Sequence, residues 1–477
     1  MTTATAPHRL WRNSRYLTWL VSDTSKGLAA ALFAFAIPLL ALIVTNDPAQ
    51  AGIIGGAGMV SRLALTLIGG ILADRHRRIV LMLTGSLVGI LLSGAFTVLA
   101  LADALTFGTL LAANVLLAAR GGLFDVAGES AIKEIVPGDA MGRAQAANQG
   151  RDAALQLAGG PLGGVLLGVG GWLVGVVMTL CHAVAAVTAW MLQREARRAG
   201  VVDSGADRGV DGAAGVGGGS AVAGPAVDPA DGLGFTADAA QDAVAMDAAE
   251  DALASDAGAA PARTSAWAEL REGFGWLLSR PDLGGVLLII TIINLGFNAA
   301  ITTVIYALQQ DGYSELLIGS LSAAIGAVML VGAVVAPTLV PRIRAGVLAI
   351  SGLTVVAVGT IVLSMVTQPW AIVIVLGASV LLLPALNAGM MGYFMVATPT
   401  QLLGRANSAA AVLGMGAMPL APLIAGFGLT WIGREWTILV CAALCVIAVA
   451  LALGNRALRA LPVESRWAEH ATQYEAP

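Results

Sequence analysis

Long apolar runs recur twelve times along this chain of 477 residues, and no other feature limits its fold so strongly. A helical run of about twenty apolar residues matches the hydrocarbon core of a bilayer. Hydrophobic residues make up 57% of the chain and charged residues 12%, whereas a soluble domain carries about 25% charged residues. The mean hydropathy is +0.81. We therefore predict an all-α membrane protein with twelve transmembrane helices.

The predicted spans form two sets of six. The first set lies near Leu17–Val44, Ala49–Ala73, Ile79–Ala102, Leu105–Ala131, Ala146–Gly168 and Trp172–Leu192. The second set lies near Leu283–Gln309, Leu316–Val340, Ala345–Val366, Trp370–Ala397, Ala406–Trp431 and Trp436–Gly454. We expect an N-terminal six-helix bundle over residues 1–198, a C-terminal six-helix bundle over 281–460 and a cytoplasmic tail over 461–477.

The sequence between the two sets is of another kind. Residues 199–262 carry eleven acids and a single base, Arg208, with almost no aromatic residues. Such a segment cannot bury enough apolar surface to order itself, so we predict a disordered acidic cytoplasmic linker over residues 199–264. Apolar residues at helical spacing follow it: Trp267, Leu270, Phe274, Leu277 and Leu278. They predict an interfacial amphipathic helix over residues 265–280.

The basic residues indicate the orientation. With a cytoplasmic N-terminus, twenty-one of the 26 Lys and Arg residues fall on cytoplasmic segments, and only Arg434 falls outside. Because cytoplasmic loops attract basic residues, both termini and the linker are predicted to be cytoplasmic. Residues Met1–Arg15 lack the apolar core of a signal peptide, so we expect the first span to act as the insertion signal.

The two halves resemble repeats of one unit. Pro137, Gly142, Arg143 and Ala144 before the fifth span recur before the eleventh span at a constant offset of 262, as Pro399, Gly404, Arg405 and Ala406. The same offset relates Gly70 to Gly332. Two six-helix halves repeated in parallel predict a binding site between them, near the middle of the bilayer.

A loop motif follows the second span. It reads Gly70-Ile71-Leu72-Ala73-Asp74-Arg75-His76-Arg77-Arg78. The Gly allows two helices to approach, and the Asp offers an anion to the N-terminus of a neighbouring helix. The run resembles the loop signature of the major facilitator superfamily, with Arg77 where the family usually has a second Gly. This resemblance implies the major facilitator fold and a secondary active transporter that works by alternating access.

Further elements are similar to one branch of that family. The run Leu10-Trp11-Arg12-Asn13-Ser14-Arg15-Tyr16 and the two Pro-x-x-x-x-Gly-Arg-Ala elements resemble the macrolide-efflux and enterobactin-exporter branch of drug–proton antiporters. The run Gly159–Gly164 is similar to their Gly-Pro element, although Gly160, Gly164 and Gly168 also fit a plain close-packing stripe. The resemblance implies a proton-coupled exporter of small amphiphilic molecules (a drug, an antibiotic or a siderophore), a monomer in the bacterial inner membrane.

Ionisable residues inside the predicted spans are candidates for coupling, because charges at membrane depth are costly. All lie in the first half: Asp23, Lys26, Arg62, Arg120, Asp125, Glu129, Arg151 and Asp152. We predict that Asp23 is the leading proton carrier and that Arg120, where many family members have an Arg tied to proton transfer, is its modulator. The alternative is a fixed pair between Asp23 and Lys26, which lie three residues apart on one helix.

A second group of residues is predicted to form a cytoplasmic gate. It comprises Gly70, Asp74, Arg75, Arg78, Asp125 and Glu129. We expect Asp74 to approach the N-terminal turn of the eleventh span when the cytoplasmic side is closed. The resemblance implies that Arg78 then pairs with an acid of the fourth span. Alternatively, Asp125, Glu129 and Lys133 form a structural ion-pair ladder at i, i+4 and i+8.

The predicted substrate cavity combines one cation with neutral polar and soft side chains. Its candidates are Arg62, Asn294, Asn298, Tyr306, Asn387 and Met390. An apolar cavity with a few such groups suits an amphiphilic ligand, although hydrogen bonding between helices would use the same residues.

Other classes of protein find little support in the sequence. The four His and three Cys residues form no metal-ligand or nucleophile–base pattern, so we expect neither an enzyme nor a cofactor or metal. The expected partners are a small-molecule substrate, protons and the lipid bilayer, without nucleic acid. An importer of the same fold, or an uncoupled scaffold or scramblase, remains an alternative function.

The predicted topology can be tested by cysteine labelling of intact cells. In a background without the three native cysteines, we expect Ser204→Cys to react with an impermeant maleimide only after the cells are permeabilised, because the linker is cytoplasmic. Asp103→Cys, in the predicted external loop after the third span, is the control and should react in intact cells. Labelling of Ser204→Cys in intact cells would contradict the topology.

Overall fold

The structure, a computed structural model, describes residues 13–136, 140–198, 266–280, 283–399 and 402–473, and its regular elements there are helices. The first half contains α1 (Ser14–Thr45), α2 (Pro48–Arg75), α3 (Arg78–Leu101), α4 (Phe107–Ile135), α5 (Met141–Val169) and α6 (Gly171–Arg198). The second half begins with α8 (Ala266–Ser279), α9 (Gly284–Gln310), α10 (Glu315–Leu339) and α11 (Ala345–Met365). It continues with α12 (Pro369–Val380), α13 (Leu383–Ala397), α14 (Leu403–Met415), α15 (Leu420–Trp431), α16 (Gly433–Gly454), α17 (Arg456–Ala460), the 3₁₀ helix η3 (Glu464–Arg466) and α18 (Trp467–Thr472).

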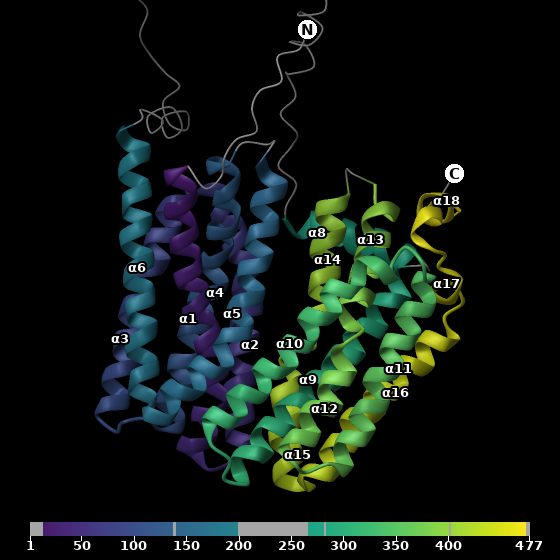
Figure 1. Cartoon of the computed structure of the whole chain (residues 1–477). Helices are drawn as coiled ribbons and strands as arrows, with labels where there is room; N and C mark the ends of the chain where they lie inside the picture. Colours follow the sequence, from purple (N-terminus) through teal and green to yellow (C-terminus); the bar gives the residue numbers. More distant parts are fainter. Residues whose placement is uncertain (1–12, 137–139, 199–265, 281–282, 400–401, 474–477) are drawn as a thin grey trace, which may run out of the picture.

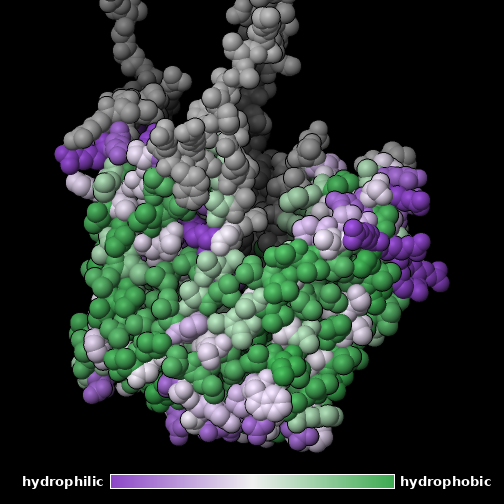
Figure 2. All heavy atoms as spheres, in the orientation of Figure 1, coloured by the Kyte–Doolittle hydropathy of each residue, from purple (hydrophilic) through white to green (hydrophobic). Residues whose placement is uncertain are grey.

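The outer surface of both halves is apolar, as lipid requires. Within the described residues, twelve stretches of helix are long and apolar enough to cross a membrane. Large apolar side chains lie on the outside, with Val334 and Trp431 72% and 74% exposed. Figure 2 shows these residues as a broad hydrophobic belt with polar residues gathered at both ends. The prediction of an all-α protein with twelve spans is confirmed.

Two of the predicted spans, Trp370–Ala397 and Ala406–Trp431, each contain a short break in the α-helix. The first divides into α12 and α13 just before Pro384, whose ring and missing N–H interrupt a helix. The second divides into α14 and α15 across Gly416–Pro419. There the backbone makes shorter-range bonds, such as Met418 N–H to the Met415 carbonyl at 3.0 Å.

The two halves contact each other near one end and diverge toward the end at which α1 begins and α6 ends (Figure 1). The contacts join α5 to α10 and α2 to α15. Glycines make them close: a Cβ added at Gly160 would lie 2.8 Å from the Gly319 carbonyl oxygen, and one at Gly56 3.0 Å from the Pro419 carbonyl oxygen. One polar contact is Gln309 Nε2 donating to the Leu39 carbonyl at 2.9 Å.

Segments near the predicted domain borders also form helices. The helix expected at 265–280 is present as α8, which packs against α14 and buries Leu277 while Leu278 stays exposed. Part of the expected tail folds back as η3 and α18, and the Pro462 carbonyl accepts the N–H of Ala345 at 3.1 Å, at the start of α11. The predicted linker lies outside the described residues.

The close contact between the halves predicts the effect of adding a methyl group. Gly319→Ala should lower the melting temperature of the purified protein, because overpacking costs about 1–3 kcal/mol and the new Cβ meets the Gly160 backbone. Gly168→Ala is the matched control, since a Cβ there meets nothing within 4 Å. Equal melting temperatures for the two variants in thermal unfolding would refute the close contact.

Candidate functional site

A group of charges joins α1 to α5, and we call Asp23, Lys26, Arg151 and Asp152 the Asp23 cluster. Asp23 and Lys26 are buried, whereas Asp152 is exposed. Asp23 Oδ1 lies 3.1 Å from Lys26 Nζ, and Asp23 Oδ2 lies 2.8 Å from a terminal nitrogen of Arg151. Arg151 also pairs with Asp152 at 2.8 Å. Asp23 thus holds two cations, one on its own helix and one on α5, as expected for charges that pair whenever they lie at membrane depth.

Residues of α1 and α4 pack around this cluster. The Arg151 guanidinium lies 5.8 Å from the ring centre of Trp19, within the range of a cation–π contact. The Trp19 indole N–H donates to the Gly128 carbonyl on α4 at 3.0 Å. A Cβ at Gly128 would collide with Lys26 Nζ and lie 2.9 Å from Asp23 Oδ1. The Asp23 cluster therefore depends on a glycine of a third helix.

A second group, the Arg120 cluster, consists of Arg120, Asp125 and His182. Arg120 pairs with Asp125 at 2.8 Å, with the two side chains 5% and 25% exposed. The other terminal nitrogen of Arg120 lies 3.4 Å from both His182 Nδ1 and the Gly85 carbonyl oxygen. His182 is buried on α6, so this cluster ties α4 to α3 and α6.

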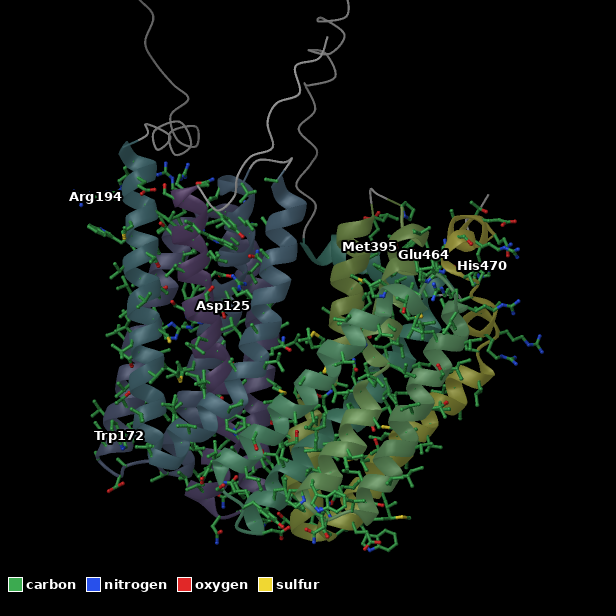
Figure 3. All side chains as sticks on the ribbon, in the orientation of Figure 1. Asp125, Trp172, Arg194, Met395, Glu464 and His470 are labelled. Atoms are coloured by element: carbon green, nitrogen blue, oxygen red, sulfur yellow. The ribbon has the colours of Figure 1, made fainter. Side chains whose placement is uncertain are left out.

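The Arg120 cluster opens onto a cavity of about 170 Å³ inside the first half. Its wall comes from α1, α2, α4 and α6, and Arg62, Arg120, Asp125 and His182 are its ionisable groups among the described residues. Figure 3 shows Asp125 among the helices of the first half. Asp23 is not part of this wall, so the two candidate carboxylates differ in their access to the cavity.

The residues predicted to form one substrate cavity come from both halves. Arg62 lines the first-half cavity, whereas the second-half candidates do not. Asn294 donates to the Gly414 carbonyl at the end of α14 at 3.4 Å, and Asn298 donates to the Asn294 carbonyl at 2.9 Å. Tyr306 is fully buried beside Gly55, where the halves meet. Met390 is buried in the core, and Asn387 is exposed.

The structure describes the side chains of only part of the predicted gate. The side chains of Asp74 and Glu129 lie outside the described part of the structure. Arg78 donates to the Ser130 carbonyl on α4 at 3.2 Å, Arg75 is exposed, and Asp125 pairs with Arg120 instead. A Cβ added at Gly70 would meet no atom within 4 Å. The close approach of two helices that we expected at Gly70 is made instead by Gly69, which packs against the Gly122 and Leu123 carbonyls of α4. Because the halves diverge at this end, a gate closed to the cytoplasm remains a prediction.

Two polar side chains of the cavity wall, His182 and Asn114, were missed by the sequence reasoning. Asn114 is buried and donates to the Ile54 carbonyl on α2 at 2.6 Å. His182 is the single ionisable residue within the otherwise apolar segment Trp172–Leu192, and this isolation was the available signal. In the described residues, no group of three or more His, Cys, Asp or Glu side chains is arranged to hold a metal ion.

Comparison with known proteins gives the family. A family model described as the Major Facilitator Superfamily matches residues 24–419. Similar solved structures include a bacterial homologue of the iron transporter ferroportin in an inward-facing state, with 13% identity, a TM-score of 0.62, and 92% of this chain and 97% of that chain covered. A bacterial homologue of the human lysosomal transporter Spinster has 15% identity, a TM-score of 0.62 and coverage of 94% and 98%. A D-xylose–proton symporter has 14% identity, a TM-score of 0.58 and the same coverage. No curated protein matches.

The Arg120 cluster predicts non-additive effects of substitution on stability. Arg120→Gln should lower the free energy of unfolding because Asp125 then lacks its counter-ion. In the double variant with Asp125→Asn, the loss should be smaller than the sum of the single losses, by about 0.5–3 kcal/mol. Detergent-induced unfolding of the purified protein gives these values, with Arg456→Gln on exposed α17 as the control. Strict additivity would mean that the pair does not contribute to stability.

Proposed function

The chain belongs to the major facilitator superfamily, and from that membership we propose that it is a proton-coupled exporter of small amphiphilic molecules. The family and the fold are those of transporters. Export is supported by the Pro-x-x-x-x-Gly-Arg-Ala and Gly-Pro elements, which resemble those of the macrolide-efflux and enterobactin-exporter branch of drug–proton antiporters. The Lys and Arg distribution supports cytoplasmic termini in a bacterial inner membrane.

The arrangement of the halves supports alternating access. They contact each other at one end and diverge at the end where α1 begins and α6 ends (Figure 1). In the proposed orientation, the diverging end faces the cytoplasm, where an exporter takes up its substrate. Rocking of one half against the other would move the point of closure from α2–α15 and α5–α10 to the cytoplasmic gate. An importer would pass through the same arrangement, so direction has to be measured.

The observation that carries the proposal of coupling is a carboxylate on the cavity wall beside an arginine. Asp125 is partly exposed, lines the cavity and lies 2.8 Å from Arg120. A proton on Asp125 would release Arg120, so proton binding and the shape of the cavity would be linked. Asp23 remains the leading carrier predicted from the sequence, with Arg120 as modulator. Its two cationic partners favour the structural alternative, and Asp125 is therefore a second candidate carrier.

Transport into proteoliposomes with an imposed pH gradient tests the proposal. We expect the parent protein to concentrate at least one compound from a panel of anionic, cationic and neutral amphiphiles, and only when the gradient is present. Replacing the proton carrier by its amide should abolish gradient-driven accumulation but keep substrate exchange, because exchange needs no net proton transfer. Asp23→Asn and Asp125→Asn are compared in the same assay.

The outcomes separate the alternatives. If Asp23→Asn accumulates substrate as the parent does, with the same pH dependence, Asp23 carries no proton. Loss of accumulation only in Asp125→Asn assigns the proton to Asp125. Facilitated flux that ignores the gradient in the parent protein would refute coupling, and the absence of flux for every compound would favour an uncoupled scaffold. Accumulation opposite to the expected direction would identify an importer.

A further inference from the structure

Arg62 is a cation without a counter-ion among the described side chains. It lies in the middle of α2, is exposed toward the first-half cavity, and has no ion-pair partner among the described side chains. The three other cations of the first-half spans, Lys26, Arg120 and Arg151, each lie within 3.1 Å of a carboxylate oxygen. A charge at membrane depth is costly unless it has a partner or a function. Arg62 therefore differs from every comparable residue of the described first half.

The described Arg and Asp side chains of the cavity wall leave an excess of one positive charge. Arg62 and Arg120 line the wall with Asp125 and the His182 ring. Asp125 is bound to Arg120, and the carboxylates of the Asp23 cluster are occupied by Lys26 and Arg151. An anion entering the cavity would thus meet one guanidinium that no described carboxylate already neutralises. Beside the apolar wall of the cavity, such a charge attracts an anion more strongly than it would in bulk water.

The rest of the cavity wall suits an apolar group. Phe33, Ile37, Met59, Leu117 and Met178 line it with small residues from α1, α2 and α4. The volume of about 170 Å³ is close to that of a cavity that binds benzene, about 150 Å³. The cavity therefore has room for a ring or a short branched chain beside the charged end of Arg62.

We propose that this cavity binds a small organic anion, with its acidic group on Arg62 and its apolar body against α1 and α4. A carboxylate, sulfonate or phosphate matches the fork of guanidinium donors. The proposal names the substrate class of the exporter proposed above and rests on that function only for the claim that the bound anion is transported.

Three matched ligands test whether the cavity prefers an anion to a cation or a neutral molecule. Radiolabelled phenylbutyrate, phenylbutylamine and phenylbutanol share one apolar body and differ in the head group. We measure their equilibrium binding to the full chain in nanodiscs of zwitterionic lipid, with empty nanodiscs subtracted. Phenylbutyrate should bind most tightly. Arg62→Gln should weaken its binding roughly ten- to a hundredfold, the range for a hydrogen bond to a charged group, and leave phenylbutanol binding unchanged.

Two further variants make the test specific. Arg62→Lys should keep part of the affinity for phenylbutyrate, since it preserves the charge but not the fork. Arg459→Gln removes an exposed cation from α17 and should change nothing. Equal binding of the three ligands, preference for the amine, or unchanged phenylbutyrate binding by Arg62→Gln would each overturn the proposal. If Arg62→Gln fails to fold, the ligand preference of the parent and the Arg62→Lys variant decide.

The source of the anion is resolved by competition. Displacement of phenylbutyrate by short-chain phosphatidylglycerol supports an anionic lipid as the natural ligand, and failure to displace it supports a soluble organic anion. Binding that depends on Arg62 without gradient-driven flux would refute only the transport function. Transport of cations or neutral compounds without anion binding would refute only the present proposal.

Discussion

Lipid offers no hydrogen-bond partner, and the rest of this structure depends on that constraint. A backbone in the hydrocarbon core satisfies its polar groups by forming helices, and wherever a helix is interrupted another group has to serve. At the end of α14, the carbonyl oxygens of Leu413 and Gly414 accept bonds from Thr291 at 2.7 Å and Asn294 at 3.4 Å. Polar side chains of α9 thus make possible a break that lipid alone would not tolerate.

The same constraint determines where charges pair, and the contacts within the first half differ in kind from those between the halves. Within the first half, polar groups connect different helices: Asp23 on α1 with Arg151 on α5, and Arg120 on α4 with His182 on α6. Between the halves, the contacts are mainly close backbone packing at glycines, such as Gly160 against Gly319. Close packing of small residues is specific in shape but releases without leaving an unpaired charge. The first half is therefore held together by charged contacts that the described boundary between the halves lacks.

The sequence predicted the helices better than it predicted their partners. The twelve apolar runs were sufficient to predict the spans. A hydropathy profile, however, does not reveal a break of the helix inside an apolar run. The signals for the two breaks were Pro384 and the Gly416–Pro419 segment. The pairing of Asp23 with Arg151 required knowledge of which helices are neighbours. Their depths did agree, since Asp23 is the tenth residue of α1 and Arg151 the eleventh of α5. At 1.5 Å per residue, both lie about 15 Å from the start of their helices.

The interruption of the eleventh span lies where that span changes partners. On one side of it, α14 packs against α8 and α9 of its own half, and on the other side α15 packs against α2 of the first half as well as against α9. Gly416–Pro419 replaces α-helical bonds by shorter turns between these two parts. A segment without continuous helical bonds absorbs changes in backbone angles at low cost. The break thus lies between α14, which is held by its own half, and α15, which is held by both halves and packs against Gly52 and Gly56.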